Sequence, residues 1–406
     1  MTLQAPIVER QSHETPDTAR ASTRLPMVLH TRVITGAGGG PDKTILNSPR
    51  FLGDLGYRSA CVFLRPPGDE AFQVIRDRAV AAQADIEEID DHGALDWRIV
   101  PRLLSTCRRL NVDIWHAHDY KTNALGIVLR RFHPMRLVTT SHGWVEYTPR
   151  TRLYYLCDRW SLPRYERVIC VSPDIREQCC RYGVSDERAQ LIENAIDTDQ
   201  FRRKRSVDEA KSLLDWPPGR MLLGGAGRLS EEKGFDDLIR SVRELVDRGI
   251  DVGLIIIGEG QQRSVLAGLI HQLNLADRVR LAGFQSDLRP FYEAMDLFVL
   301  SSRREGLPNV VLEAMALEMP VVSTRVAGVP RLITDGENGL LVDLGDRPAL
   351  SSAVARALGD ADLRRALAKA GRSTIEQRYS FAERMKKVAA VYDELLGNTA
   401  DGTPPR

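Results

Sequence analysis

Residues 297–316, which read LFVLSSRREGLPNVVLEAMA, contain the pattern that decides the fold. Leu297–Leu300 is an apolar run of strand length, and a small polar loop follows it. Pro308 and Asn309 suit the start of a helix, because a proline at the first helical position loses no intrahelical hydrogen bond. The stretch therefore predicts a strand, a loop and a helix whose first backbone N–H groups can bind an anion.

The same alternation extends outward along the chain and predicts parallel sheets covered by helices on both faces. The strands expected in the first half are Pro26–Thr31, Ser59–Leu64, Val112–His116, Arg136–Thr140 and Arg167–Val171. Those expected in the second half are Met221–Ala226, Val252–Ile257, Val279–Ala282, Leu297–Leu300 and Pro320–Thr324. Two consecutive units of this kind imply an α/β protein with two Rossmann-like, doubly wound domains that face each other across a cleft.

Four segments are expected along the chain. Residues 1–24 are polar and have no apolar core, so they predict a disordered extension, not a signal peptide. Residues 25–200 and 201–380 are the two domains, because the charged stretch Asp199–Asp208 between them is a poor core sequence. A last helix within residues 381–397 is expected to cross back toward the first domain.

The composition excludes several classes of protein. The chain has 406 residues, of which 43% are hydrophobic and 27% charged, and its net charge is +1. This balance gives no general reason to expect nucleic-acid binding. No apolar run reaches the roughly 18–20 residues that a membrane span needs. Six scattered cysteines form neither a disulfide framework nor a metal-ligand pattern, so a reducing cytoplasm is the simplest location.

Two glutamates lie on either side of the expected helix start. Glu305 is in the loop, and Glu313 is about one turn inside the helix. The apolar neighbours of Glu313 make a surface position less favourable for it. Separated in this way, the two carboxylates are expected to meet different parts of one ligand and not to share one metal ion.

Several motifs around these glutamates occur in the order typical of one family. They are Gly227-Arg228-Leu229 with Glu232-Lys233-Gly234, Ile257-Gly258-Glu259-Gly260, Asn338-Gly339-Leu340-Leu341-Val342 and, near the domain junction, Asn194-Ala195-Ile196-Asp197. With the Glu305–Glu313 spacing, this set resembles family 4 of the retaining glycosyltransferases (glycosyl transferases group 1), which has the GT-B fold.

The resemblance implies a donor site for a nucleotide diphosphate sugar in the second domain. Arg228 and Lys233 would offset the diphosphate charge, Glu305 would hold the donor sugar and Glu313 the ribose, with Glu305, Arg228 and Lys233 counted as catalytic. A guanidinium grips phosphate oxygens as a planar fork, and an ammonium acts as a point charge, so neither a metal ion nor a cofactor is expected. The donor loop would comprise Gly306, Leu307, Pro308 and Asn309.

In the first domain, glycines follow the first expected strand and let a backbone approach phosphate closely. The resemblance places Gly38 and Gly39 against the donor diphosphate, and Lys43 on the acceptor side. His118 and His142 end two further strands, which puts both at the edge of the sheet that faces the cleft. By resemblance, His118 would contact the donor sugar as a catalytic residue and His142 the acceptor.

Two features need separate interpretation. Asp197-Thr198-Asp199 has the DxD pattern of metal-dependent glycosyltransferases, but it lies in the junction motif, and we expect it to cap a turn instead. Arg331 stands where the family has an acid, and it could pair with Asp335 or Glu337 or meet an acidic sugar.

The functional prediction is a retaining, metal-independent glycosyltransferase that serves a carbohydrate or lipid-linked acceptor in cell-surface polysaccharide or glycolipid synthesis. Lys121–Arg181 holds eleven Lys/Arg against five Asp/Glu with interleaved aromatics. This segment favours peripheral docking on anionic lipid over nucleic-acid binding, with an ordinary charged surface as the alternative. A nucleotide-sugar 2-epimerase of the same fold and a non-catalytic nucleotide-sugar sensor or scaffold stay open, whereas the absent dinucleotide fingerprint disfavours an oxidoreductase.

Overall fold

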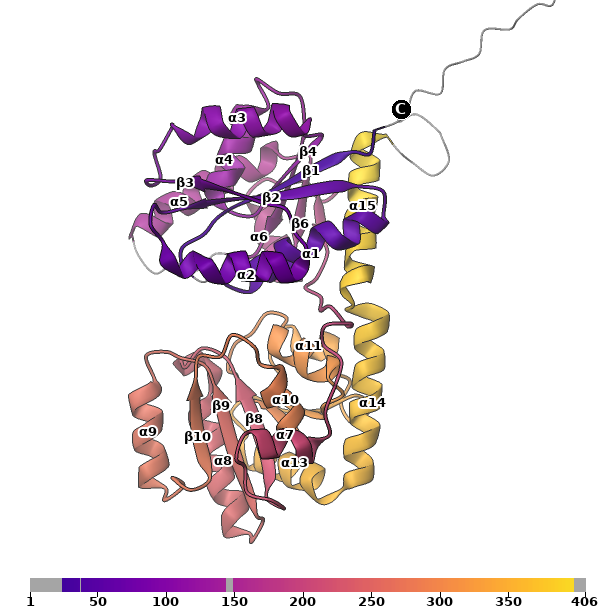
Figure 1. Cartoon of the computed structure of the whole chain (residues 1–406). Helices are drawn as coiled ribbons and strands as arrows, with labels where there is room; N and C mark the ends of the chain where they lie inside the picture. The colour runs from indigo at the N-terminus through magenta and orange to yellow at the C-terminus, as the bar shows by residue number, and fades with distance from the viewer. Residues whose placement is uncertain (1–23, 37, 144–148, 398–406) are drawn as a thin grey trace, which may run out of the picture.

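The computed structural model describes residues 24–36, 38–143 and 149–397. Two parallel sheets form two domains, which lie one above the other in Figure 1. The first sheet has the order β3-β2-β1-β4-β5-β6-β7, and the second has the order β10-β9-β8-β11-β12-β13. Every neighbouring pair of strands is parallel. The predicted α/β architecture with two Rossmann-like domains is confirmed.

The strands of the first sheet are β1 (Met27–Val33), β2 (Arg58–Arg65), β3 (Ile86–Asp90), β4 (Ile114–Ala117), β5 (Arg136–Ser141), β6 (Arg167–Cys170) and β7 (Ala189–Leu191). Those of the second sheet are β8 (Met221–Ala226), β9 (Val252–Ile257), β10 (Val279–Gly283), β11 (Leu297–Leu300), β12 (Val321–Thr324) and β13 (Leu340–Val342). The sequence did not predict β3, β7 or β13 as strands, and all three are sheet edges. An edge strand pairs on one side only and needs no continuous apolar run, as Ile-Glu-Glu-Ile-Asp in β3 illustrates.

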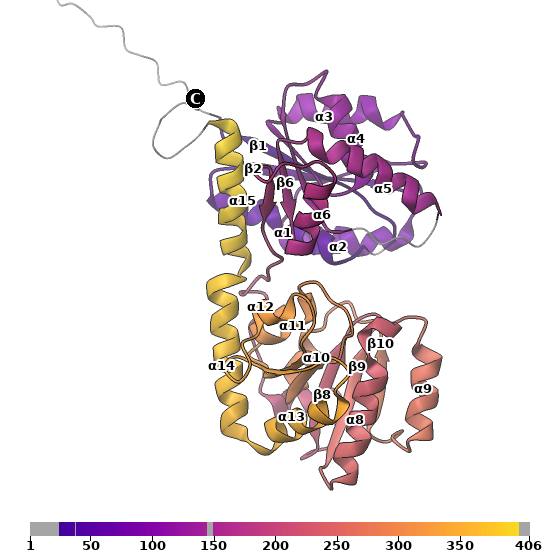
Figure 2. The same cartoon turned by 180° about the vertical axis from the view of Figure 1, so that it is seen from behind.

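Helices cover both faces of each sheet (Figures 1 and 2). In the first domain they are α1 (Gly40–Asp54), α2 (Gln73–Ala82), α3 (Ile99–Leu110), α4 (Tyr120–Leu129), α5 (Pro149–Ser161) and α6 (Pro173–Arg181). The second domain contains α7 (Val207–Leu213), α8 (Phe235–Asp247), α9 (Arg263–Gln272), α10 (Arg289–Ala294), α11 (Asn309–Ala316), α12 (Val329–Leu332) and α13 (Arg347–Gly359). Two last helices, α14 (Ala361–Arg378) and α15 (Phe381–Leu396), run along one side of the molecule.

Helix α15 belongs to the core of the first domain although it ends the described chain. Phe381, Met385 and Tyr392 pack in one apolar cluster with Val28 of β1 and Ile114 of β4. The helix is also held by polar contacts, because Tyr57 Oη donates to Asp393 Oδ1 at 2.6 Å and Arg167 pairs with Glu394. The chain therefore crosses between the domains twice.

The two crossings are joined to each other by backbone hydrogen bonds. Ile196 N donates to Tyr379 O at 2.9 Å, and Phe381 N donates to Ile196 O at 2.8 Å. The charged stretch next to the first crossing is fastened to α10, where buried Glu293 accepts from Lys204 N and pairs with Arg205. Arg203 adds hydrogen bonds to the backbone carbonyls of Glu293 and Leu317, so the arginine-rich linker is held against the second domain by several contacts.

Among the described residues, no helix is both long enough and apolar enough to span a bilayer.

Candidate active site

The loop after β11 and the loop after β8 meet at a pair of opposite charges. Lys233 Nζ lies 2.7 Å from Glu305 Oε1, and Ser302 Oγ donates to the same oxygen at 2.7 Å. Glu305 is largely buried, with 9% of its side chain exposed. An ammonium has three N–H donors, so Lys233 keeps donors for a second ligand while it holds Glu305 in place.

Close backbone packing brings these loops together. Gly234 has φ +61°, and a Cβ there would lie 2.2 Å from Ser301 O. Gly258 has φ +140°, and its Cβ would lie 1.9 Å from Gly227 O. Glycine is required at both positions, since any side chain would push apart the loops that carry Arg228 and Lys233.

Arg228 is exposed and pairs with Glu232 one turn along, at 2.9 Å from Nη2 to Oε1. The two cations predicted for the diphosphate therefore lie in neighbouring loops, each in contact with a glutamate. The Arg228–Glu232 pair is largely exposed and can exchange partners readily, because water screens it.

Helix α11 begins at Asn309, as the sequence predicted, and Pro308 precedes it without a side-chain cap. In the first turn, the backbone N–H groups of Val311 and Leu312 both donate to Pro308 O. Gly306 is held against Gly328, where a Cβ would lie 2.3 Å from Gly306 O. The loop before α11 is thus held in place by its contact with Gly328. The first backbone N–H groups of α11 point out of the helix at its N-terminus.

Glu313 is buried at the boundary between the domains. Its Oε2 accepts from Tyr292 Oη at 3.1 Å, and its Oε1 lies 3.1 Å from Lys43 Nζ. Lys43 belongs to α1 of the first domain, so this ion pair joins the two domains. The structure thus brings Lys43, expected on the acceptor side, to the carboxylate expected to bind the donor ribose.

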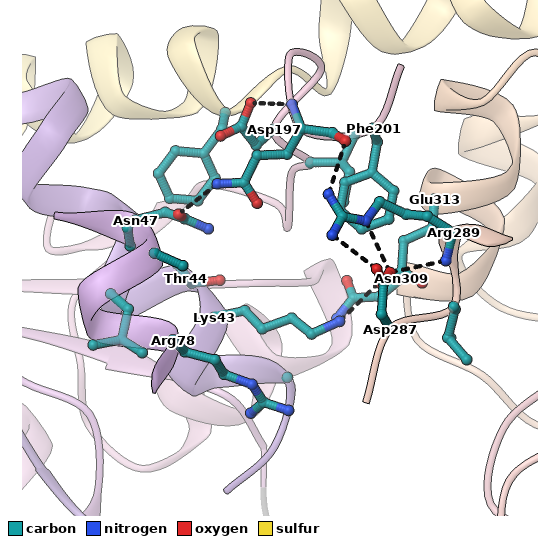
Figure 3. Close-up of a pocket in the computed structure, with 18 of the residues that line it drawn as sticks. Lys43, Thr44, Asn47, Arg78, Asp197, Phe201, Asp287, Arg289, Asn309 and Glu313 are labelled. Carbon is teal, nitrogen blue, oxygen red and sulfur yellow. Dashed lines mark hydrogen bonds and ion pairs between the residues drawn. The ribbon is translucent and has the colours of Figure 1, made fainter. Parts of the chain in front are cut away.

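A cavity of about 220 Å³ surrounds this ion pair (Figure 3). Helix α1 contributes Lys43, Thr44 and Asn47, and the second domain contributes Asn309 and Glu313. The other lining residues include Arg78, Asp197, Gln200, Phe201, Asp287 and Arg289. Glu305, Arg228 and Lys233 are not among the residues that line this cavity.

The glycine-rich loop before α1 is wrapped around Asp42. Gly39 N donates to Asp42 Oδ2 at 2.5 Å, and Arg32 Nε lies 2.7 Å from Asp42 Oδ1. Gly38 has φ +70°, and a Cβ there would lie 2.6 Å from Asp42 Oδ2. Gly40 faces Asn309 of the second domain, with 3.1 Å between its ideal Cβ position and Asn309 Nδ2. The loop and the α11 N-terminus are therefore direct neighbours across the domain boundary.

Four histidines form a polar layer: His30 lies in the middle of β1, His116 and His118 at the carboxyl end of β4, and His142 just after β5. His118 and His142 have ring centroids 5.8 Å apart, which places together two residues that the sequence predicted for the cleft. Behind them, His30 Nδ1 lies 3.1 Å from His118 Nε2. His116 Nδ1 lies 2.5 Å from Tyr392 Oη of α15, which extends the layer to the last helix.

All four imidazoles are neutral. Burial, with the charge of Arg384, lowers the pKa of His30 to about 3. Burial also lowers the pKa of His116, His118 and His142 well below the ordinary value. Neutral rings can donate or accept hydrogen bonds to hydroxyl groups without adding charge.

The ligand nitrogens of His30, His116 and His118 come within 4.8 Å of one another, so a metal site has to be considered. The rings of His116 and His118 are stacked, with an interplanar angle of 16°. Stacked rings direct their nitrogens side by side, whereas a metal needs them to converge. Both nitrogens of His116 already face hydroxyls, those of Tyr392 and Thr140. The chemistry of this layer fits a hydrogen-bond network and not a metal centre.

Two interpretations from the sequence can now be checked. Arg331 pairs with Glu193 at 2.9 Å, so the expected partners Asp335 and Glu337 are wrong. Glu193 follows β7 of the first domain, and sequence distance gave no reason to choose it. Asp197 Oδ1 accepts from the backbone N–H of Asp199 and Gln200, which confirms that this triplet caps a turn.

Sequence reasoning missed Tyr292, Asp42 and His30. Tyr292 and Asp42 belong to no sequence motif, and only their contacts in the folded chain show their place in the site. His30 could have been found, since it pairs in register with His116 on the neighbouring strand. Parallel neighbours in register share a face of the sheet, so histidines at matching positions of two adjacent strands lie side by side.

Two parallel α/β domains with cations, carboxylates and a helix N-terminus where they meet define a protein of the GT-B class. The fold is shared with solved structures across nearly the whole chain. A glycosyltransferase from Rickettsia africae matches with a TM-score of 0.75 at 17% identity, covering 92% of this chain and 99% of that one. Anabaena HepE in complex with UDP also matches with a TM-score of 0.75, at 18% identity, covering 91% and 100%.

Sequence comparison gives the family. Residues 38–200 match the model of Glycosyltransferase Family 4, and residues 207–374 match that of Glycosyl transferases group 1. The lipopolysaccharide core biosynthesis mannosyltransferase LpsB of Rhizobium meliloti is 31% identical over 70% of this chain and 80% of its own length. LpsE of the same organism, a lipopolysaccharide core biosynthesis glycosyltransferase, is 39% identical over 57% of this chain. That match spans 64% of LpsE, less than two thirds of its length. The chain belongs to the glycosyl transferases group 1 family.

Proposed function

We propose that the chain is a glycosyltransferase that moves a sugar from a nucleotide diphosphate sugar to a carbohydrate or lipid-linked acceptor. One observation carries this proposal. Glu305 and Glu313 flank the N-terminus of α11, and each is in contact with a lysine. Such a site presents a carboxylate at either end and positive potential between them. A diphosphate with a hydroxyl-bearing sugar on one side and a ribose on the other has the complementary pattern.

In the proposed reaction, charge builds on the departing diphosphate as the bond to the sugar breaks. Lys233 and Arg228 would stabilise that charge, and Lys233 can do so without releasing Glu305. These fixed cations support a metal-independent reaction. We further propose that the anomeric configuration is retained, with the departing phosphate as the acceptor of the incoming hydroxyl's proton. His118 and His142 are neutral and would bind sugar hydroxyls of donor and acceptor.

The proposed acceptor belongs to cell-surface polysaccharide assembly, and the names of LpsB and LpsE support a lipopolysaccharide-type glycan. HepE was solved with UDP, which makes UDP-sugars the first donors to test. The decisive experiment incubates the protein with UDP-, GDP- and ADP-sugars, with and without lipid extract or core oligosaccharide, and follows release of nucleoside diphosphate. Acceptor-stimulated release supports a transferase, binding without turnover supports a sensor, and a changed sugar without release supports the epimerase.

Two finer points need their own measurements. The configuration of the product's anomeric carbon, read by NMR, tests retention, since inversion would overturn it. Turnover in excess EDTA tests metal independence, because loss of activity that Mg²⁺ or Mn²⁺ restores would contradict it.

We also propose peripheral docking on anionic lipid through α5, where Leu156 and Trp160 are exposed one turn apart. Pairing reduces the positive charge of this region, since Lys121, Arg130 and Arg167 each contact a carboxylate. Docking would therefore depend more on these apolar side chains than the sequence suggested. Two further aromatic residues of the Lys121–Arg181 segment, Trp144 and Tyr147, lie outside the described residues. Equal flotation with neutral and anionic liposomes would contradict this proposal.

A further inference from the structure

The carboxylate of Glu313 is held by two partners that differ in origin and mobility. Tyr292 of α10 contacts Oε2 from within the second domain, and Lys43 of α1 contacts Oε1 from the first domain. Only 4% of the Glu313 side chain is exposed, whereas 44% of the Lys43 side chain is. One oxygen is therefore bound to a fixed group, and the other to a long side chain that reaches across the domain boundary.

Tyr292 is fixed by its surroundings. The residue is fully buried in the core of the second domain, and its ring lies 5.7 Å from the ring of Phe298 on β11. Burial raises the pKa of its phenol well above the ordinary value, so the group stays a hydrogen-bond donor. Its hydroxyl is also 3.3 Å from Val310 O, but a carboxylate is the stronger acceptor. Tyr292 thus donates to Glu313 from a position that cannot shift without disturbing the core.

The contact on Oε1 is of the opposite kind. The Lys43 ammonium enters the interdomain cavity shown in Figure 3, and a flexible stem of four carbons carries it. Such a side chain can leave at little cost, because its charge can be hydrated when it turns outward. Oε1 is therefore the oxygen of Glu313 that a ligand in the cavity can reach.

We propose that Tyr292 is a positioning residue for donor binding: it holds Oε2 of Glu313 and aims Oε1 at the cavity, where a ribose hydroxyl replaces Lys43. The inference rests on the proposed function, since it assumes that a nucleotide ribose enters this cavity. Tyr292 belongs to none of the sequence motifs, and the exchange of Lys43 for a ribose hydroxyl takes place on one oxygen atom of Glu313.

The test measures how strongly the protein distinguishes a ribose hydroxyl. Calorimetry with UDP, GDP and ADP first identifies the nucleoside diphosphate that binds most tightly. Its 2′-deoxy and 3′-deoxy counterparts are then measured, and the larger ratio of Kd values is the hydroxyl preference. We expect a preference of about tenfold or more, because a buried carboxylate loses a hydrogen bond when the hydroxyl is absent.

In Tyr292→Phe, which removes one oxygen atom and keeps the ring, the preference should fall to about threefold or less. A purely structural role would weaken ribo- and deoxyribonucleotides equally and leave the ratio unchanged, and that result would overturn the proposal. Tyr379→Phe is the matched control, since its hydroxyl donates to Arg331 O in the same domain and not to Glu313. The control should keep the full hydroxyl preference.

Lys43→Met provides a second test on a half-exposed residue whose loss leaves the cores intact. If the ammonium competes for Oε1, this variant should keep or increase the hydroxyl preference, whereas a fall to the level of Tyr292→Phe would overturn the exchange. Should none of the three nucleoside diphosphates bind at millimolar concentration, the proposed function fails and this inference fails with it. Binding with an unchanged ratio in Tyr292→Phe rejects the inference alone.

Discussion

At the scale of single residues, the proposed donor site consists of charges that already have partners. Lys233 contacts Glu305, Arg228 contacts Glu232, and Lys43 contacts Glu313. In the proposed reaction a diphosphate sugar inserts itself among these pairs, and each pair would supply either a cation for phosphate or a carboxylate for a hydroxyl. Loss of one member therefore removes a ligand contact and also leaves its partner unbalanced.

Lys233→Ala and Glu313→Ala should each reduce acceptor-dependent turnover by about 10²–10³-fold, the range for removing one preorganised electrostatic contact. The readout is nucleoside diphosphate release at saturating donor, with thermal unfolding to show that each variant is folded. Lys386→Ala on α15 is the control, because Lys386 is exposed and pairs with Glu383 of the same helix. Near-normal rates for both site variants would reject the site assignment.

The Arg331–Glu193 pair can be tested by exchanging the two charges. Arg331→Glu places two carboxylates side by side and should lower the free energy of unfolding by about 1 kcal/mol, a modest value because the pair is partly exposed. The double variant Arg331→Glu with Glu193→Arg should recover most of that loss in urea unfolding. Additive losses in the double variant would show that the two residues do not interact.

A site residue could be predicted from the sequence when its partners are close to it along the chain. Glu305 and Glu313 were predicted because a strand, a loop and a helix start lie within twenty residues of sequence. Tyr292 and the partner of Arg331 could not be, since each contact joins segments that only the folded chain brings together.

At the scale of elements, the tight loops of the second domain depend on glycines with one permitted conformation. Gly234→Ala should destabilise the protein by about 3 kcal/mol, because it combines an unfavourable positive φ with a collision against Ser301 O. Gly249→Ala is the matched control, with φ +77° and open space around its Cβ position, and should cost about 1 kcal/mol. Urea unfolding of both variants measures the difference, and equal losses would contradict the collision.

The strands and helices that the sequence predicted are those with strong periodicity. Central strands such as β9, Val252–Ile257, are buried along their whole length and read as continuous apolar runs. Edge strands such as β3 carry carboxylates, and Glu88 is neutralised by Arg65 and Arg76 only in the folded sheet. Their strand character comes from pairing, which a single segment of sequence does not reveal.

At the scale of the whole molecule, the layer of buried histidines predicts sensitivity to acid. The pKa of His30 is about 3 in the folded chain and 6.5 ordinarily, so between these pH values the unfolded chain binds more protons. Stability is therefore complete above pH 6.5 and decreases as the pH falls below it. His116, His118 and His142 are shifted in the same direction.

Each such histidine contributes at most about 1.4 kcal/mol per pH unit, so the four together contribute up to about 5.5 kcal/mol per unit. Urea unfolding at pH 7.5, 6.5 and 5.5 should show a steep decrease over the last interval. His30→Asn should reduce that slope by about a quarter. A slope that is flat over the last interval would show that these imidazoles are protonated in the folded chain.

The double crossing between the domains has a consequence for how the molecule can be taken apart. Leu25 and Leu396 line one surface groove of the first domain, so the described chain leaves that domain and returns to it, and the second domain is in effect an insertion. A protease that cuts only between Arg202 and Ser206 would leave both pieces joined through α14 and α15. Release of the second domain therefore requires two cuts, one in each connection.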